Sequence, residues 1–369
     1  MIKTNLHRFW EGQLKRQHLE DLKIANADPL GVDEIIQWVP KLNQGNNVGQ
    51  LIRDLYRSLP VPKKLAKFNY YESQAAMRDI GIYLGSIRKY GLEPVSEVPE
   101  LDFVLGELSE KTDMPPRDTL LHYTIWNPAG RRLRTYTKYE EERELINSVK
   151  ISFNPLMEAI HRLIDLYWTS PYSSDFVFLC KELETVFKNV IAGIVHAKRT
   201  VPPELFANEL RFYFEPISIY NQDLIGPGAV EMPLFVYDYI LWGADVKNDK
   251  YQIFAKTYLK FNLPQTRDIF YNFAEKNSLV SNMVLELNKP DLNPTVLASA
   301  KALISLCNQE KSFRIPHKRL AEQSYKHQKG PEAKEVGSGG YSTSILNDIL
   351  TVNIQQIDRL KRSVDRILN

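Results

Sequence analysis

A histidine at position 317 has neighbours that suit a planar ligand carrying negative charge. His317 directly follows Pro316, and basic side chains surround it in the sequence, namely Lys311, Arg314, Lys318 and Arg319, with apolar Phe313, Ile315 and Leu320 between them. An imidazole can ligate iron, and guanidinium and ammonium groups bind carboxylates, so this segment could hold an apolar macrocycle with two propionates. The alternative is a solvated basic helix start, opened by Pro316, with an incidental histidine.

Two glycine-rich turns are further candidates for ligand contacts. Gly226-Pro227-Gly228-Ala229 precedes an apolar segment, and Gly337-Ser338-Gly339-Gly340-Tyr341 follows Tyr325. Glycines allow backbone N–H groups to close on a carboxylate, and Ser338 adds a hydroxyl. Such turns also occur for purely local reasons, which remains the alternative for each.

Several common reaction types lack their motifs in this chain. The sequence contains no H-E-x-x-H, no C-x-x-C, no P-loop, no G-x-S-x-G and no G-x-G-x-x-G after a strand-like run. No two of the seven histidines are four residues apart, which argues against a two-histidine metal site on a helix. Zinc hydrolase, dithiol redox, nucleotide hydrolase and α/β-hydrolase functions are therefore disfavoured.

Length and composition describe an ordinary globular chain. The 369 residues are 43% hydrophobic and 25% charged, with 47 basic and 45 acidic side chains. The length predicts two domains, which we place at 1–125 and 126–369. Positive charge is not concentrated enough to indicate nucleic acid or an anionic membrane as partner. Without a long apolar stretch or a signal peptide the expected location is cytoplasmic, and Cys180 and Cys307 are expected to be buried thiols.

The dominant hydrophobic period is helical, so we predict an all-α fold. Helices are expected over Glu72–Tyr90, Asp175–Arg199 and Tyr139–Trp168, the last kinked at Pro155. Pro115-Pro116 predicts a further helix over Arg117–Trp126, and Asn293 is expected to cap a long helix that starts at Pro294. Linkers are expected at 92–99, 127–138 and 328–344.

Several strings taken together resemble the bacterial monodechloroaminopyrrolnitrin synthase family. They are Ala75–Gly81, Leu84–Ser86, Pro115–Arg117, Trp126–Pro128, Leu210–Ile217, Leu224–Phe235, Phe313–His317, Leu320–Glu322, Tyr325 and Gly337–Tyr341. Their order and spacing agree with the family from about residue 70 to residue 345. The stretch Lys326–Val336 is slightly longer than the family pattern, and residues 1–70 and 344–369 match weakly.

The resemblance implies the helical fold of the heme-dependent indoleamine and tryptophan dioxygenases, with heme b between helices of the large domain. His317 matches the axial iron ligand, and Ser338 and Tyr325 match active-site residues, with Gly339 in the same loop as Ser338. Arg211 matches the arginine that faces the substrate carboxylate, and Phe206 matches an aromatic residue beside the indole. The alternative for Arg211 is an internal ion pair. Ser152 matches a position on the distal side of the heme, and the alternative is that it is an ordinary helix serine.

Helix geometry is compatible with one shared site for His317 and Tyr325. Eight residues at about 100° each place the two side chains roughly 80° apart around a helix and about two turns along it. In the implied site Arg314, Lys318 and Arg319 contact the propionates, while Gly226 and Gly228 approach the substrate.

The implied function is oxidative rearrangement of L-tryptophan or a chlorinated tryptophan to an aminophenylpyrrole. The partners would be an indole amino acid, dioxygen or peroxide and an electron donor, in a chain that forms a homodimer. Cleavage of the indole ring, as in the dioxygenases, is the first alternative. A non-catalytic heme or indole sensor or carrier is the second, and a heme-free helical interaction protein is the third.

Overall fold

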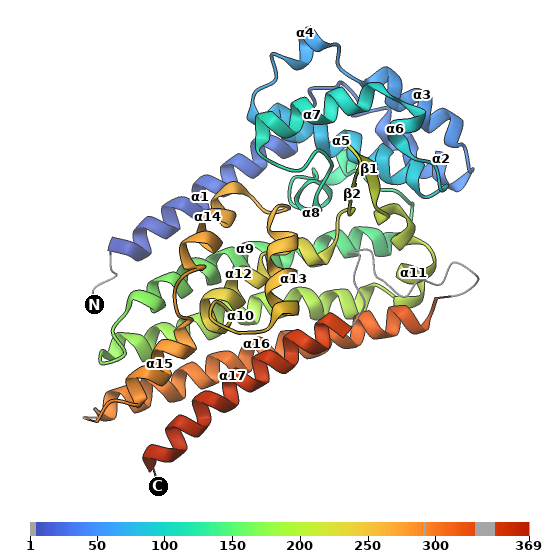
Figure 1. Ribbon diagram of the computed structural model, residues 1–369. Coiled ribbons are helices and arrows are strands. Elements are labelled where there is room, and N and C mark those ends of the chain that lie inside the picture. The colour runs from blue at the N-terminus through green and yellow to red at the C-terminus, as the bar shows by residue number, and fades with distance from the viewer. Residues whose placement is uncertain (1–4, 291–292, 329–343, 369) are drawn as a thin grey trace.

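A computed structural model describes residues 5–290, 293–328 and 344–368. Four long helices lie alongside one another, and a group of shorter helices gathers at one end of them (Figure 1). The long helices are α9 (Glu140–Trp168), α10 (Ser174–Thr200), α16 (Pro294–Lys326) and α17 (Ser344–Leu368). α9 packs along α10, α10 along α16, and α16 along α17.

The remaining helices precede α9 or connect α10 to α16. The first group is α1 (Asn5–Asn26), α2 (Val39–Gln44), α3 (Val48–Ser58), α4 (Pro62–Leu65), α5 (Tyr70–Arg88), α6 (Pro94–Glu97), α7 (Glu100–Thr112) and α8 (Leu120–Tyr123). The second group is α11 (Pro203–Asn208), α12 (Leu234–Asp238), α13 (Asp249–Leu259), α14 (Pro264–Phe273) and α15 (Leu279–Leu287). Single-turn 3₁₀ segments are η1 (Ile36–Trp38), η2 (Gly130–Arg132), η3 (Leu210–Phe214) and η4 (Ala229–Glu231), and η5 (Tyr239–Gly243) is a π-helix.

The described residues contain one short antiparallel hairpin, β1 (Ile217–Ile219) with β2 (Gln222–Leu224). Ile217 pairs with Leu224, and Ile219 pairs with Gln222. Tyr220 and Asn221 form the turn at positive φ. With every other described element helical, the predicted all-α fold is confirmed.

Helix ends follow the capping chemistry of the sequence. The Asn69 side chain accepts a hydrogen bond from the Glu72 backbone N–H at 3.0 Å, and the Glu72 carboxylate accepts one from the Asn69 N–H at 2.9 Å, so α5 begins with a capping box. The Asn293 side chain accepts a hydrogen bond from the Thr295 N–H at 2.8 Å and begins α16 as predicted. Helix α9 continues through Pro155.

Two expected helix starts are wrong. Residues 115–119 are not helical, and α8 begins only at Leu120, because the buried Arg117 guanidinium reaches the Leu224 carbonyl at 2.7 Å and holds this segment against the hairpin. Pro316 lies inside α16 rather than at its start. The carbonyl that loses its partner there belongs to the exposed Ser312, where water can replace the missing donor.

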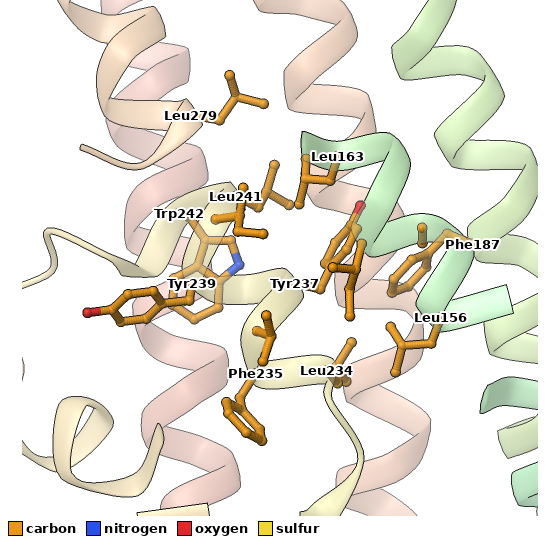
Figure 2. Close-up of a cluster of buried hydrophobic side chains, with 14 of the residues drawn as sticks. Leu156, Leu163, Phe187, Leu234, Phe235, Tyr237, Tyr239, Leu241, Trp242 and Leu279 are labelled. Atoms are coloured by element: carbon orange, nitrogen blue, oxygen red, sulfur yellow. The ribbon is translucent and has the colours of Figure 1, made fainter. Parts of the chain in front are cut away.

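Two hydrophobic cores hold these elements together. The larger core joins α9, α10, α16 and α17 with α12 to α15, and Figure 2 shows its centre, where Tyr237, Leu241 and Trp242 lie among side chains of neighbouring helices. The smaller core lies under α2 to α7 but also takes in Tyr136, Ile146 and residues 210–224. This core therefore contains residues from both sides of the predicted boundary at 125/126, and the division into two domains stays a prediction.

Buried charges also tie the N-terminal helices to the loop before α9. Asp79 on α5 pairs with Arg78 at 2.8 Å and with Arg134 at 2.9 Å, and all three side chains are buried. Arg134 also pairs with Asp33. The two guanidinium partners satisfy the buried carboxylate, and the pairs fix the path of both segments. Cys180 and Cys307 are free and buried, as predicted. No helix in the described part of the chain is long and apolar enough to cross a membrane.

Candidate functional site

A cavity with a mostly apolar lining lies between the long helices and the end where the shorter ones gather. Its volume is about 280 Å³, near the lower end of protein ligand sites, which run from about 300 to 1,000 Å³. Most of its lining is apolar, which suits a planar ligand. The lining comes from α8 to α13, η3, η4, α16 and α17, and includes Tyr123, Ser152, Phe206, Arg211, Gly228, Phe254, Phe313, Arg314, His317, Tyr325 and Ile349.

His317 faces this cavity from α16 as a neutral imidazole. Burial, together with the nearby positive charge of Arg314, lowers its pKa to about 4. The Phe313 ring lies one turn earlier, with its centroid 5.8 Å from that of the imidazole. Among the described residues neither ring nitrogen has a hydrogen-bond partner. A neutral imidazole whose unprotonated nitrogen keeps its lone pair is able to ligate a metal.

Arg314 lies three residues before His317 and is held by two acidic side chains. Its guanidinium pairs with Asp238 on α12 and, at 3.0 Å, with Glu310 on α16. Glu310 also accepts hydrogen bonds from Trp242 Nε1 at 2.7 Å and from Asn353 Nδ2 at 3.0 Å. Burial raises the pKa of Asp238 well above its usual range, against the opposing charge of Arg314. The network joins α12, η5, α16 and α17 beneath the segment that carries His317.

The other two basic side chains predicted to meet propionates lie outside the cavity lining. Lys318 Nζ is 3.5 Å from the Glu322 carboxylate one turn away, and Arg319 is exposed. A role for Arg314, Lys318 and Arg319 toward the propionates therefore stays a prediction.

Arg211 and Tyr325 form a polar end of the cavity. Arg211 on η3 is buried, and Tyr325 lies on α16 two turns beyond His317. Burial raises the pKa of Tyr325, and the charge of Arg211 partly opposes that rise, so the two groups are close enough to interact. The structure thus places His317, Tyr325 and Arg211 around one cavity.

Phe206 and Gly226 shape the wall next to Arg211. The Phe206 ring stacks on that of Phe214, with centroids 6.4 Å apart. Gly226 packs so tightly on η3 that a Cβ there would come within 2.6 Å of the Phe214 carbonyl oxygen. It therefore holds the loop against η3 without lining the cavity, whereas Gly228 lines it. Ser338 and Gly339 fall outside the described residues.

Ser152 lines the cavity where α9 crosses α10. Its hydroxyl donates a hydrogen bond to the Val190 carbonyl at 2.8 Å, and Gly193 leaves the space that its side chain fills. The Ser152 hydroxyl can still accept a hydrogen bond from a ligand.

Sequence reasoning missed several residues of the lining. Tyr123 and Thr124 lie on or next to α8, Phe254 on α13, and Leu346 and Ile349 on α17. The final helix resembles the family only weakly, and its contribution follows from its packing along α16. The apolar period within α17 identifies a buried face, but the sequence does not say which side of the cavity that face meets.

Comparison with protein families identifies the family to which the chain belongs. The family model described as monodechloroaminopyrrolnitrin synthase PrnB matches residues 15–364. The match covers almost the whole chain, including every element that lines the cavity.

Proposed function

Because this chain belongs to the monodechloroaminopyrrolnitrin synthase family, we propose that His317 holds heme b in the cavity and that Arg211 and Tyr325 hold the amino-acid end of the substrate. Members of the family are heme-dependent enzymes of pyrrolnitrin biosynthesis that act on a chlorinated tryptophan. The resemblance seen in the sequence strings and the predicted enzyme class are thereby confirmed. The residue assignments below are our proposal.

The donor set of the cavity fits heme better than a bare metal ion. In the described residues no group of three or more His, Cys, Asp or Glu side chains could hold a metal. A lone imidazole supplies one ligand, so it can retain only a metal that brings its own equatorial ligands, as heme iron does. The observation that carries the proposal is that His317 lines the cavity and that its ring has no hydrogen-bond partner among the described residues.

The chain itself would bind and orient the substrate. Arg211 offers a planar guanidinium fork for the carboxylate, and its buried position strengthens that interaction. Tyr325 would stay a neutral phenol because burial raises its pKa, so it can donate a hydrogen bond to the same end. Phe206 and the neighbouring Phe214 present aromatic surface for the indole.

The apolar part of the wall would exclude water from the reacting ring. Val149, Ile194, Ala197 and Phe313 lie along it on three different helices. Heme, when bound, supplies the oxidative chemistry with dioxygen or peroxide. By resemblance alone, we propose that the loop containing Ser338 and Gly339 covers the amino-acid end of the substrate.

Visible absorption spectra test the axial assignment. Protein reconstituted with hemin should show a Soret band that L-tryptophan perturbs, and His317→Ala should lose or shift that band. His196→Ala is the control, since His196 lies outside the cavity lining and pairs with Glu144. Identical spectra for wild type and His317→Ala, with no response to tryptophan, would contradict the proposal.

Product analysis tests the reaction outcome. Incubation with 7-chlorotryptophan, dioxygen or peroxide, and a reductant should give an aminophenylpyrrole, detected by mass. Formylkynurenine products would indicate ring cleavage instead. A homodimer, an external electron donor and a cytoplasmic location are further parts of the proposal, and light scattering of the purified chain checks the first.

A further inference from the structure

Three tyrosine rings stack on one another from the cavity wall into the smaller core. Tyr123 lines the cavity, and its ring centroid lies 5.4 Å from that of Tyr136 with the planes 25° apart. The Tyr136 ring lies 4.5 Å from that of Tyr213 at 15°. The three side chains are 3%, 0% and 1% exposed. The near-parallel rings therefore form one continuous buried column.

The far end of the column meets a half-buried lysine. Lys89 Nζ donates a hydrogen bond to the Tyr213 hydroxyl at 3.0 Å and lies 4.9 Å from the Tyr213 ring centroid. Burial lowers the pKa of Lys89, but its side chain still reaches solvent. The column thus connects the cavity to the surface at Lys89.

A proton acceptor is fixed at the cavity end. The Tyr123 hydroxyl donates to Glu142 Oε1 at 2.9 Å. Glu142 also accepts hydrogen bonds from the backbone N–H groups of Tyr136 and Thr137, both at 2.7 Å, and from the Thr137 hydroxyl at 2.6 Å. Burial raises the pKa of Glu142, and these four hydrogen bonds oppose that rise because they favour the carboxylate form. In that form Glu142 can take the phenolic proton of Tyr123.

The central tyrosine is placed as a bridge. Its hydroxyl has no hydrogen-bond partner among the described residues, so an oxidised Tyr136 would have nowhere close to release its proton. Gly85 on α5 leaves the space for it, because a Cβ there would come within 2.7 Å of the Tyr136 hydroxyl. A phenylalanine would fill this position without burying an unpartnered hydroxyl, so packing alone does not account for a tyrosine.

We propose that the column Tyr123–Tyr136–Tyr213 carries electrons from the surface at Lys89 to the cavity. When peroxide is consumed with no substrate present, Tyr123 gives up one electron toward the cavity, and its phenolic proton passes to Glu142. A small one-electron reductant such as ascorbate at Lys89 then gives an electron that passes through the Tyr213 and Tyr136 rings to Tyr123, which recovers its proton from Glu142. Neither Tyr213 nor Tyr136 is left oxidised, so neither phenol has to release a proton.

For each molecule of peroxide that is reduced, two electrons must pass along the column, one after the other. Peroxide takes two electrons and two protons and becomes two molecules of water, while two molecules of the reductant each give up one electron and one proton. The inference rests on the proposed function, because the oxidising equivalents arise where His317 would hold heme. The proposed route would deliver electrons to the cavity and protect it from peroxide when no substrate is present. Binding of substrate does not depend on this route.

Freeze-quench electron paramagnetic resonance with peroxide tests this route. Wild-type protein reconstituted with hemin and containing ring-deuterated tyrosine should give a tyrosyl radical narrower than that of unlabelled protein. Tyr123→Phe should reduce the signal severalfold, because Tyr123 alone in the column has a proton acceptor. Tyr136→Phe should keep the radical but slow its decay on addition of ascorbate severalfold.

Tyr83→Phe is the matched control. Tyr83 belongs to the same core and is buried with an unpartnered hydroxyl, and it makes no ring–ring contact with the described residues. It should leave both signal and decay unchanged. An undiminished radical in Tyr123→Phe, or a wild-type decay rate in Tyr136→Phe, would overturn the proposed route.

Two further measurements keep the outcomes distinct. A Soret band in each variant shows that heme is bound, so a normal band without a Tyr123 radical refutes only the route. Absence of the band from wild type refutes the proposed function and the route with it. If Tyr123→Phe does not fold, spin trapping followed by mass spectrometry locates the radical in wild type. An adduct on Tyr123 supports the route, and an adduct only on Tyr325 or elsewhere contradicts it.

Discussion

His122, which is buried, and His317, which is half-buried, lie on helices that line the same cavity, and they differ in the hydrogen bonds of their ring nitrogens. Burial lowers the pKa of His122 to about 3 and that of His317 to about 4, so both are neutral at pH 7. His122 Nδ1 accepts a hydrogen bond from the Thr119 N–H at 3.0 Å, and Nε2 donates to the Gln74 side chain at 2.8 Å. His317 has no such partner among the described residues. The first histidine holds structure, and the second is available to a ligand.

The two sides of the cavity differ in the kind of polar group that they present. On the side of α8 and α9, the hydroxyls of Thr124, Ser148 and Ser152 all donate to backbone carbonyls. On the other side, η3 and α16 present a guanidinium group, a phenol and an imidazole, from Arg211, Tyr325 and His317. The first side offers hydroxyls that already fix the wall, and the second offers the groups that we propose bind ligand. Variants on the first side should therefore change stability, and variants on the second should change binding.

Gly193→Ala should have the largest effect on stability, because it disturbs the packing of α9 against α10 on the first side of the cavity. An added Cβ would overlap the Ser152 hydroxyl and the Ser148 carbonyl oxygen, so α9 and α10 would have to separate. Overpacking of this kind costs about 1 to 3 kcal/mol, and we expect the upper end because backbone is involved. Urea unfolding measures the loss. Gly49→Ala is the control, since a Cβ there meets only the flexible Arg53 side chain at 3.5 Å; equal stability of the two variants would contradict the prediction.

Arg211→Gln should test the second side through ligand affinity. Loss of a charged hydrogen bond to the carboxylate costs about 1.5 to 3 kcal/mol, so the Kd for tryptophan should rise about 10- to 100-fold. Arg211→Lys should lie between wild type and Arg211→Gln, because the charge stays while the planar fork is lost. Titration of the Soret band gives each Kd. Tryptamine, which lacks the carboxylate, should bind wild type and variant equally, and a parallel loss for tryptamine would show that Arg211 acts only by shaping the wall.

His122 should make stability depend on pH. Its pKa lies near 3 in the folded chain and near 6.5 in the unfolded chain, so only the unfolded chain takes up this proton between those values. The contribution of the neutral imidazole is complete above about pH 6.5 and falls by about 1.4 kcal/mol for each pH unit below it. Urea unfolding of wild type and His122→Gln should therefore converge as the pH falls from 6 to 4. His327→Gln, at an exposed position, should run parallel to wild type across that range.

The long helices could be predicted because their apolar period and caps are local properties. Asn293 begins α16 as its side chain requires, and α5 and α10 agree with the predicted ranges to within about two residues. The segment from Arg117 to Leu120 could not be predicted, because its path is set by a contact between Arg117 and the distant Leu224 carbonyl. Tertiary contacts between distant segments leave no local period in the sequence.

The sequence predicts which residues form the site, but it does not predict which other side chains contact them. The sequence predicts His317 from its basic and apolar neighbours, and the family resemblance adds Arg211 and Tyr325; the structure places all three at one cavity. The pairing of Arg314 with Asp238 and Glu310 could not be foreseen, because Asp238 lies on another helix far away in the sequence. The side of the cavity formed by α17 depends likewise on how that helix packs along α16.

Ser152→Ala should have the smallest effect and would sharpen the comparison most directly. Ser152 was expected to contact substrate, yet its proton is given to the Val190 carbonyl on α10. If the hydroxyl only joins α9 to α10, removing it should cost about 1 kcal/mol of stability and leave the Kd for tryptophan within about twofold of wild type. Ser148→Ala, which loses a hydrogen bond within α9 to the Leu145 carbonyl, is the matched control. A severalfold weaker affinity in Ser152→Ala alone would show that Ser152 also binds substrate, and the boundary between the two sides of the cavity would then pass through α9.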